Sequence, residues 1–211
     1  GLGVLGYHSL FQSKLIEFDS LESKQLNHEI FKTLNERSNE ASKWLHDAKG
    51  YESLREGYAN TTMLAVAPTK SSSFIHGAVS MGIEPIKSNY FIKDLAKSKT
   101  VYKNPFLECE LEKHGLNTPE VWEDILKKDG SVQHLDFPTK GVFKSFIEIS
   151  PKEIILQAAQ RQKFIDQSQS LNLMIHPSVP AKDINQLYLY AWKEGVKTLY
   201  YQFSQSSAQA F

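Results

Sequence analysis

Residues 61–74 read TTMLAVAPTKSSSF, and this stretch indicates the fold class of the chain. Its first half, residues 61–67, is short and apolar and ends before Pro68, which predicts a buried strand. Residues 69–73 then place four hydroxyls and one ammonium group at the carboxyl end of that strand. Apolar residues at helical spacing follow over residues 74–81, so a helix is expected there, with a glycine as its end. A strand, a turn and a helix in this order are typical of an α/β protein.

The hydroxyl-rich turn, residues 68–73, admits two interpretations. A helix that begins here would present free backbone N–H groups and the positive end of its dipole to a phosphate. Alternatively, Thr69 and the three serines only cap the following helix. These residues alone leave both interpretations open.

The composition is that of an ordinary soluble globular protein. The chain has 211 residues, of which 41% are hydrophobic and 23% are charged, so it forms one large domain or part of a larger one. Acidic and basic residues balance at 24 each, so no net charge favours nucleic acid or an anionic membrane surface as a partner. No apolar run approaches the roughly 20 residues that a membrane span needs. A cytoplasmic protein is therefore expected.

The remaining chemistry-bearing residues offer no strong site. The single cysteine, Cys109, cannot form an internal disulfide, and the flanking carboxylates of Glu108 and Glu110 oppose formation of its thiolate. The seven histidines show no paired spacing that predicts a metal site. Residues 1–7 are apolar and glycine-rich without an initial methionine, which is typical of the interior of a domain.

Capping residues and hydrophobic periodicity predict the other elements. Residues 170–202 should form a βαβ unit with parallel strands, because a helical pattern separates two strand patterns. Residues 90–102 mix aromatic and basic side chains, among them Lys97, without a clear period. The expected helices cover residues 21–49 after Ser20, 105–115, 119–130, 151–167 with a capping box at Ser150 and Glu153, and 180–194.

Three stretches in this order resemble the large (α) subunit of class I ribonucleotide reductase, in its bacterial and bacteriophage form. The resemblance covers essentially the whole chain as the C-terminal third of that subunit. It implies that residues 1–203 form the C-terminal part of a ten-stranded α/β barrel and that residues 204–211 are a flexible tail. The stretches are residues 60–73 with GIEP at 82–85, FIDQSQSLNL at 164–173, and GVKTLYYQ at 195–202.

The resemblance also implies two groups of site residues. In the family, the residues matching Pro68, Thr69, Lys70, Ser71 and Ser72 hold the diphosphate of a ribonucleoside diphosphate, although an acidic residue often stands where this chain has Lys70. Tyr200 and Tyr201 match the tyrosines that relay a radical to an active-site cysteine. Neighbours on a regular strand point to opposite faces, so two stacked rings require the strand to end or distort there. The alternative is a pair of half-buried strand aromatics.

The residues that complete the family's chemistry are not found in this sequence. The thiyl-forming cysteine and the reducing cysteines of the family have no match in this sequence, and Cys109 matches none of them. The resemblance therefore implies that the chain works with an N-terminal portion of the α subunit and with a small (β) subunit. The di-iron small subunit supplies the radical, a thioredoxin- or glutaredoxin-type reductant acts on cysteines elsewhere, and this chain holds no metal. Such a complex would reduce ribonucleotides to deoxyribonucleotides for DNA synthesis.

Two other functions stay open from the sequence. One is a non-catalytic structural or regulatory fragment of the same fold. The other is a general phosphate-ester-binding α/β module.

Overall fold

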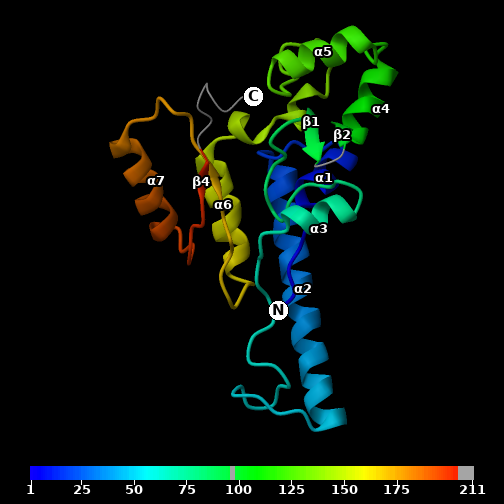
Figure 1. The fold of residues 1–211 in the computed structure, drawn as a ribbon. Coiled ribbons are helices and arrows are strands. Elements are labelled where there is room, and N and C mark those ends of the chain that lie inside the picture. The colour runs from blue at the N-terminus through cyan, green and yellow to red at the C-terminus, as the bar shows by residue number, and fades with distance from the viewer. Residues whose placement is uncertain (96–97, 204–211) are drawn as a thin grey trace.

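The computed structural model describes residues 1–95 and 98–203, so the expected tail at 204–211 and Lys97 lie outside the described residues. The α-helices are α1 (Tyr7–Ser13), α2 (Leu21–Lys49), α3 (Lys70–Ile75), α4 (Pro105–Lys113), α5 (Pro119–Lys127), α6 (Pro151–Gln162) and α7 (Ala181–Lys193) (Figure 1). Two 3-10 helices are η1 (Lys140–Phe143) and η2 (Phe146–Glu148). The strands are β1 (Tyr90–Leu95), β2 (Ser98–Lys103), β3 (Leu173–Met174) and β4 (Gln202–Phe203).

Four extended segments form a parallel array in the body of the molecule. Leu2 pairs in parallel with Leu64, and Val66 pairs in parallel with Gln169. The array continues with β3, which pairs in parallel with β4. The extended conformation of residues 61–67 and the parallel strands of the βαβ unit are thus confirmed. Within the described residues, the first segment is paired on one side only, and residues 1–3 are called the open edge below.

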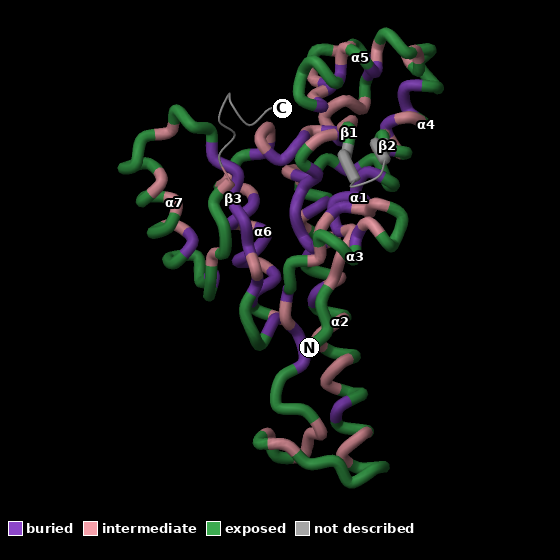
Figure 2. Tube along the Cα trace, viewed as in Figure 1, coloured by how far each residue is buried: buried purple, intermediate pink, exposed green. Residues whose placement is uncertain are grey.

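Helices α2, α6 and α7 lie side by side, with α6 between the other two (Figure 1). Their apolar faces and the parallel array enclose the main core, which burial colouring shows along the centre of the molecule (Figure 2). A second, smaller core lies between α4, α5 and η1. Fully buried members of the main core include Phe11, Leu64, Ile155 and Ala158, and those of the second include Leu107, Leu111, Ile125 and Phe143.

Helix α2 begins and ends where the capping residues predict. The Ser20 side chain accepts a hydrogen bond from the Ser23 N–H at 3.0 Å, and Gly50 closes the helix at φ 68°. The C-terminal half of α2 projects from the body together with the loop that follows it (Figure 1). Trp44 and Leu54 on this projection are exposed, because little of the described chain packs against it.

The expected helix over residues 74–81 is wrong. Helix α3 begins earlier, at Lys70, and ends at Ile75, and Gly77 and Ala78 then adopt positive φ angles that a helix cannot contain. Ser80 and Ser9 exchange hydrogen bonds between their hydroxyls and N–H groups at 3.0 and 2.9 Å. These tertiary bonds hold residues 78–81 against α1 instead of in a helix.

Helix α6 differs from its prediction at both ends. Ser150 makes no side-chain capping bond, and Glu153 instead forms an ion pair with Lys24 at 2.7 Å. The helix ends at Gln162 rather than at residue 167. The Gln162 side chain donates to the carbonyls of Ile165 and Gln167, at 3.1 and 3.0 Å, which stabilises the turn that ends the helix.

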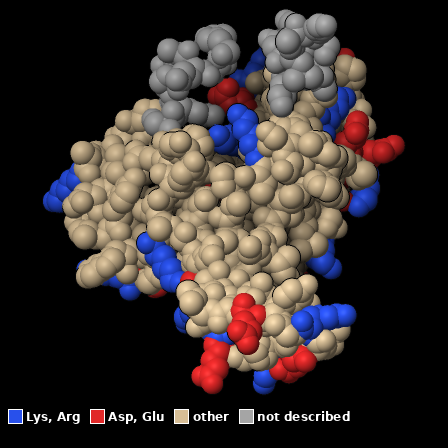
Figure 3. All heavy atoms as spheres, turned by 60° about the horizontal axis from the view of Figure 1, so that its bottom comes forward, with Lys and Arg blue, Asp and Glu red and all other residues tan. Residues whose placement is uncertain are grey.

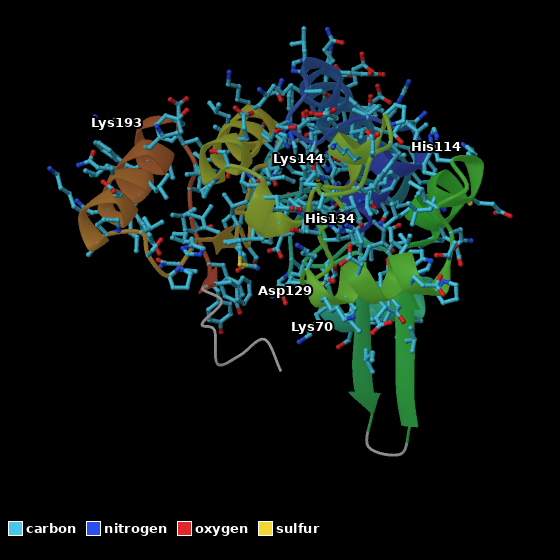
Figure 4. All side chains as sticks on the ribbon, turned by 90° about the horizontal axis from the view of Figure 1, so that it is seen from above. Lys70, His114, Asp129, His134, Lys144 and Lys193 are labelled. Atoms are coloured by element: carbon cyan, nitrogen blue, oxygen red, sulfur yellow. The ribbon has the colours of Figure 1, made fainter. Side chains whose placement is uncertain are left out.

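Residues 90–103 form a feature that the sequence did not predict. Within this stretch β1 and β2 pair antiparallel as a hairpin, with Tyr90 opposite Lys103. The hairpin extends outward from the body (Figure 4). Two of its aromatic residues pack against each other, with the ring centroids of Phe91 and Tyr102 4.8 Å apart.

Candidate functional site

A cavity of about 230 Å³ brings the hydroxyl-rich turn and the tyrosine pair together. It lies where the parallel segments end, which is where α/β barrels place their ligands. We call it the shared cavity. It is lined by Val66, Ala67, Pro68, Thr69, Lys70, Met81, Gly82, Ile83, Glu84, Lys87, Ser170, Asn172, Tyr200, Tyr201 and Phe203.

The hydroxyl-rich turn contributes three of its predicted residues to this lining, Pro68, Thr69 and Lys70. Thr69 makes no helix-capping bond, and its hydroxyl oxygen instead accepts from the Gly82 N–H at 2.7 Å. Capping alone therefore does not explain Thr69. Ser71 and Ser72 are exposed on the first turn of α3, outside the lining.

Two further side chains of the turn have clear positions. Lys70 is exposed beside the base of the β1–β2 hairpin (Figure 4). Ser73 is buried, and its hydroxyl donates to the Lys70 carbonyl at 2.9 Å. The Ser73 hydroxyl is thus used within the helix and is not available to a ligand.

The tyrosine pair has the distortion that two neighbouring rings require. The ring centroids of Tyr200 and Tyr201 are 4.2 Å apart, and β4 begins only after them, at Gln202. The Tyr200 N–H donates to the Leu171 carbonyl at 2.8 Å, whereas the Tyr201 N–H leaves the main-chain pairing and donates to Asn172 Oδ1 at 2.9 Å. Hydrogen bonding and charge repulsion between the phenols raise the pKa of Tyr200 above its usual range.

Glu84, Lys87 and Asn172 complete the wall between the turn and the tyrosines, and sequence reasoning gave none of them a role. Glu84 is buried and accepts a hydrogen bond from the Asn172 amide. Burial raises the pKa of the Glu84 carboxyl, which the Asn172 amide and the Lys87 ammonium oppose only in part. Burial also lowers the pKa of Lys87, whose ammonium lies 3.5 Å from the centroid of the Phe203 ring. Glu84 and Asn172 lie in two of the stretches that resemble the family, residues 82–85 and 164–173, but only the fold brings their side chains into contact.

Other candidate groups lie apart from the shared cavity. Cys109 is exposed on α4, beside the second core. Among residues 1–95 and 98–203, no group of three or more His, Cys, Asp or Glu side chains could hold a metal ion. No helix within this described part is long and apolar enough to cross a membrane.

The parallel array, its covering helices and the cavity at the strand ends define part of an α/β barrel. The family model described as "Ribonucleotide reductase, barrel domain" matches residues 51–202. The chain therefore belongs to the ribonucleotide reductase barrel-domain family, and the expected fold, the C-terminal part of that α/β barrel, is confirmed.

Named relatives and a solved structure agree with this assignment. The chain is 40% identical over 220 residues to the ribonucleoside-diphosphate reductase large subunit of Invertebrate iridescent virus 6, covering all of this chain and 23% of the relative. It is 31% identical to the α subunit of Treponema pallidum, covering 98% of this chain and 24% of the relative. The class Id ribonucleotide reductase α subunit of Actinobacillus ureae superposes with a TM-score of 0.87 at 51% identity, over all of this chain and 39% of that one. The chain thus spans about a quarter of the length of these curated relatives.

Proposed function

We propose that this chain supplies two parts of a ribonucleoside-diphosphate reductase α subunit. These are the binding site for the substrate diphosphate and the last two tyrosines of the radical path, in the reduction of ribonucleotides to deoxyribonucleotides for DNA synthesis. The observation that carries the proposal is the shared cavity, whose lining includes Thr69, Lys70, Tyr200 and Tyr201. A nucleotide held at the turn would place its sugar toward the tyrosines.

The turn has the chemistry that a diphosphate requires. Thr69 presents its hydroxyl at the cavity wall, and Lys70 adds an ammonium group at the same wall. Ser71 and Ser72 offer exposed hydroxyls and first-turn N–H groups beside it, which suit phosphate oxygens. Pro68 completes the turn by ending the buried strand before the polar residues begin.

The tyrosine pair has the geometry that a radical relay requires. The two rings lie 4.2 Å apart between centroids, so their phenols can exchange a hydrogen bond and an electron. A tyrosine phenol is protonated at neutral pH, and the raised pKa of Tyr200 favours that form further, so a proton is present to leave together with the electron. By this proposal Tyr201 receives the radical first and passes it to Tyr200, and Tyr200 then transfers it to the active-site cysteine.

The partners in this proposal complete the barrel and supply the radical. An N-terminal portion of the α subunit would pair with the open edge, where Leu2 is 54% exposed. The face turned forward in Figure 3 has a broad central area without charged side chains, so a partner that covers this area would bury no charge of this chain there. The di-iron small subunit would supply the radical, and a thioredoxin- or glutaredoxin-type reductant would act on cysteines elsewhere, in the cytoplasm.

Replacing Thr69 with valine tests the diphosphate site. The variant Thr69→Val keeps the shape of the side chain but removes the hydroxyl that accepts from Gly82 and faces the cavity. In the reconstituted complex we expect the KM for a ribonucleoside diphosphate to rise about tenfold, the effect of roughly one lost hydrogen bond to a charged group. We expect kcat to change much less, because the tyrosine pair is untouched.

Thr33→Val, at an exposed position on α2, is the matched control and should leave KM unchanged. An unaltered KM for Thr69→Val would refute the assignment of the turn to the diphosphate. A wild-type complex that binds nucleotide without reducing it would favour a non-catalytic fragment. Tight nucleotide binding by this chain alone would favour a general phosphate-ester module.

A further inference from the structure

The conformation of the tyrosine pair depends on the Asn172 side chain, which takes the place of a main-chain carbonyl as the hydrogen-bond acceptor for the Tyr201 N–H. On either side of Tyr201 the pairing is ordinary, since Tyr200 N–H donates to the Leu171 carbonyl and Leu173 N–H donates to the Tyr201 carbonyl. The Tyr201 N–H instead meets Asn172 Oδ1 at 2.9 Å. This interruption lets neighbouring rings lie together instead of on opposite faces. The Asn172 amide therefore stabilises the distorted backbone.

The orientation of the Asn172 amide is in turn fixed by Glu84. Asn172 Nδ2 donates to Glu84 Oε1, and both residues are buried, with 7% and 9% of their surfaces exposed. The N–H of Tyr201 can only donate and the Glu84 oxygen accepts, so the two neighbours require the same amide orientation. Because both groups are out of water, an amide without these partners would be costly.

Glu84 also lies close along the chain to the hydroxyl-rich turn. Gly82, two residues earlier, donates its N–H to Thr69 Oγ1 at 2.7 Å. The Glu84 N–H donates to the Met81 carbonyl at 3.0 Å, which holds residues 81–84 in a tight turn. A short, hydrogen-bonded path thus joins Thr69 to Tyr201 through Glu84 and Asn172.

We propose that Asn172, oriented by Glu84, is a positioning residue that fixes the tyrosine pair relative to the hydroxyl-rich turn. Asn172 accepts a hydrogen bond from the main chain of Tyr201, so in this proposal it acts through the backbone of the tyrosine pair. This inference rests on the proposed function and adds two residues to it. Their loss should slow radical transfer, measured as kcat, and leave nucleotide binding, measured as KM, nearly unchanged.

Exchanging the amide and the carboxylate between residues 172 and 84 tests the proposal in the reconstituted complex. Asn172→Asp keeps an oxygen for the Tyr201 N–H but sets an oxygen against Glu84, where a donor is needed. We expect kcat to fall about tenfold or more while KM changes less than about twofold. In the double variant Asn172→Asp/Glu84→Gln the glutamine amide donates to the new carboxylate, so the bond is restored with reversed polarity and unchanged net charge. We expect kcat to return to within about threefold of wild type.

Asn117→Asp is the matched control, because Asn117 is exposed near α5 and its oxygen still accepts from the Trp122 indole N–H. It should leave both constants unchanged. A double variant that folds but has a kcat about tenfold or more below wild type would overturn the proposal, and this comparison with wild type decides the question even if the single variant does not fold.

Tyr201→Phe, assayed beside these variants, separates two kinds of failure. If it abolishes reduction while Asn172→Asp reduces at the wild-type rate, only the positioning role is lost. If it reduces at the wild-type rate, the radical path itself is wrong and the positioning role with it.

Discussion

Replacing Tyr201 with phenylalanine should abolish ribonucleotide reduction by the reconstituted complex, lowering kcat at least about a thousandfold. Phenylalanine keeps the ring that lies 4.2 Å from Tyr200 but has no phenol to lose an electron and a proton. Tyr200→Phe should have the same effect, because a relay fails when either carrier is missing. The KM for the nucleotide should change little, since no phenol is needed to hold the diphosphate. The assay is deoxynucleotide formation with the small subunit and reductant present.

A tyrosine outside the path provides the control for this experiment. Tyr188 on α7 is 43% exposed, and Tyr188→Phe makes the same chemical change away from the shared cavity. It should leave the rate unchanged. Wild-type reduction by both Tyr200→Phe and Tyr201→Phe would remove the relay role and leave the pair as exposed aromatic residues just before β4.

Placing a charge on the open edge should prevent assembly with the proposed N-terminal portion of the α subunit. Leu2 is 54% exposed, and among the described residues its backbone pairs on one side only, with Met63 and Ala65 at 2.6 and 2.9 Å. If a further strand covers this edge, Leu2→Asp would bury a carboxylate without a partner, which costs several kcal/mol. The affinity of the two portions should therefore fall by about a hundredfold or more, as measured by titration calorimetry.

Leu126→Asp serves as the comparison, because Leu126 is a partly exposed leucine on α5, beside the second core. This variant should associate as wild type does. Equal affinities for Leu2→Asp and wild type would mean that the open edge is not where the proposed N-terminal portion binds.

The elements that depend on local chemistry were predictable from the sequence. Helix α2 begins after Ser20 and ends at Gly50 because a serine cap and a left-handed glycine act within a few residues. The capping box assigned to Ser150 failed because Glu153 is drawn to Lys24 on another helix. The true capping box lies at Ser145 and Glu148, where no helix of ordinary length follows to signal it. Tertiary contacts thus overrode local signals that looked equally good.

Only two parts of the candidate site, the hydroxyl-rich turn and the tyrosine pair, were predictable from the sequence. The hydroxyl-rich turn and the tyrosine pair carry distinctive residue types, and the expected distortion at Tyr201 follows from strand geometry. The wall between them is made by Glu84 and Asn172, which are 88 residues apart in the chain. The residues around Glu84 and around Asn172 do not indicate that the two side chains are in contact. Their positioning roles could therefore be inferred only from the structure.

The central claim is that the hydroxyl-rich turn and the tyrosine pair serve one nucleotide in one cavity. The most direct test replaces Tyr200 with 3-aminotyrosine, whose ring is more easily oxidised and therefore retains the radical. In the reconstituted complex we predict a radical at residue 200 that forms only with the small subunit and a ribonucleoside diphosphate. We predict that its electron–nuclear double resonance spectrum contains a 31P coupling from the bound diphosphate. A radical at residue 200 without that coupling, or reduction without any radical there, would contradict the account.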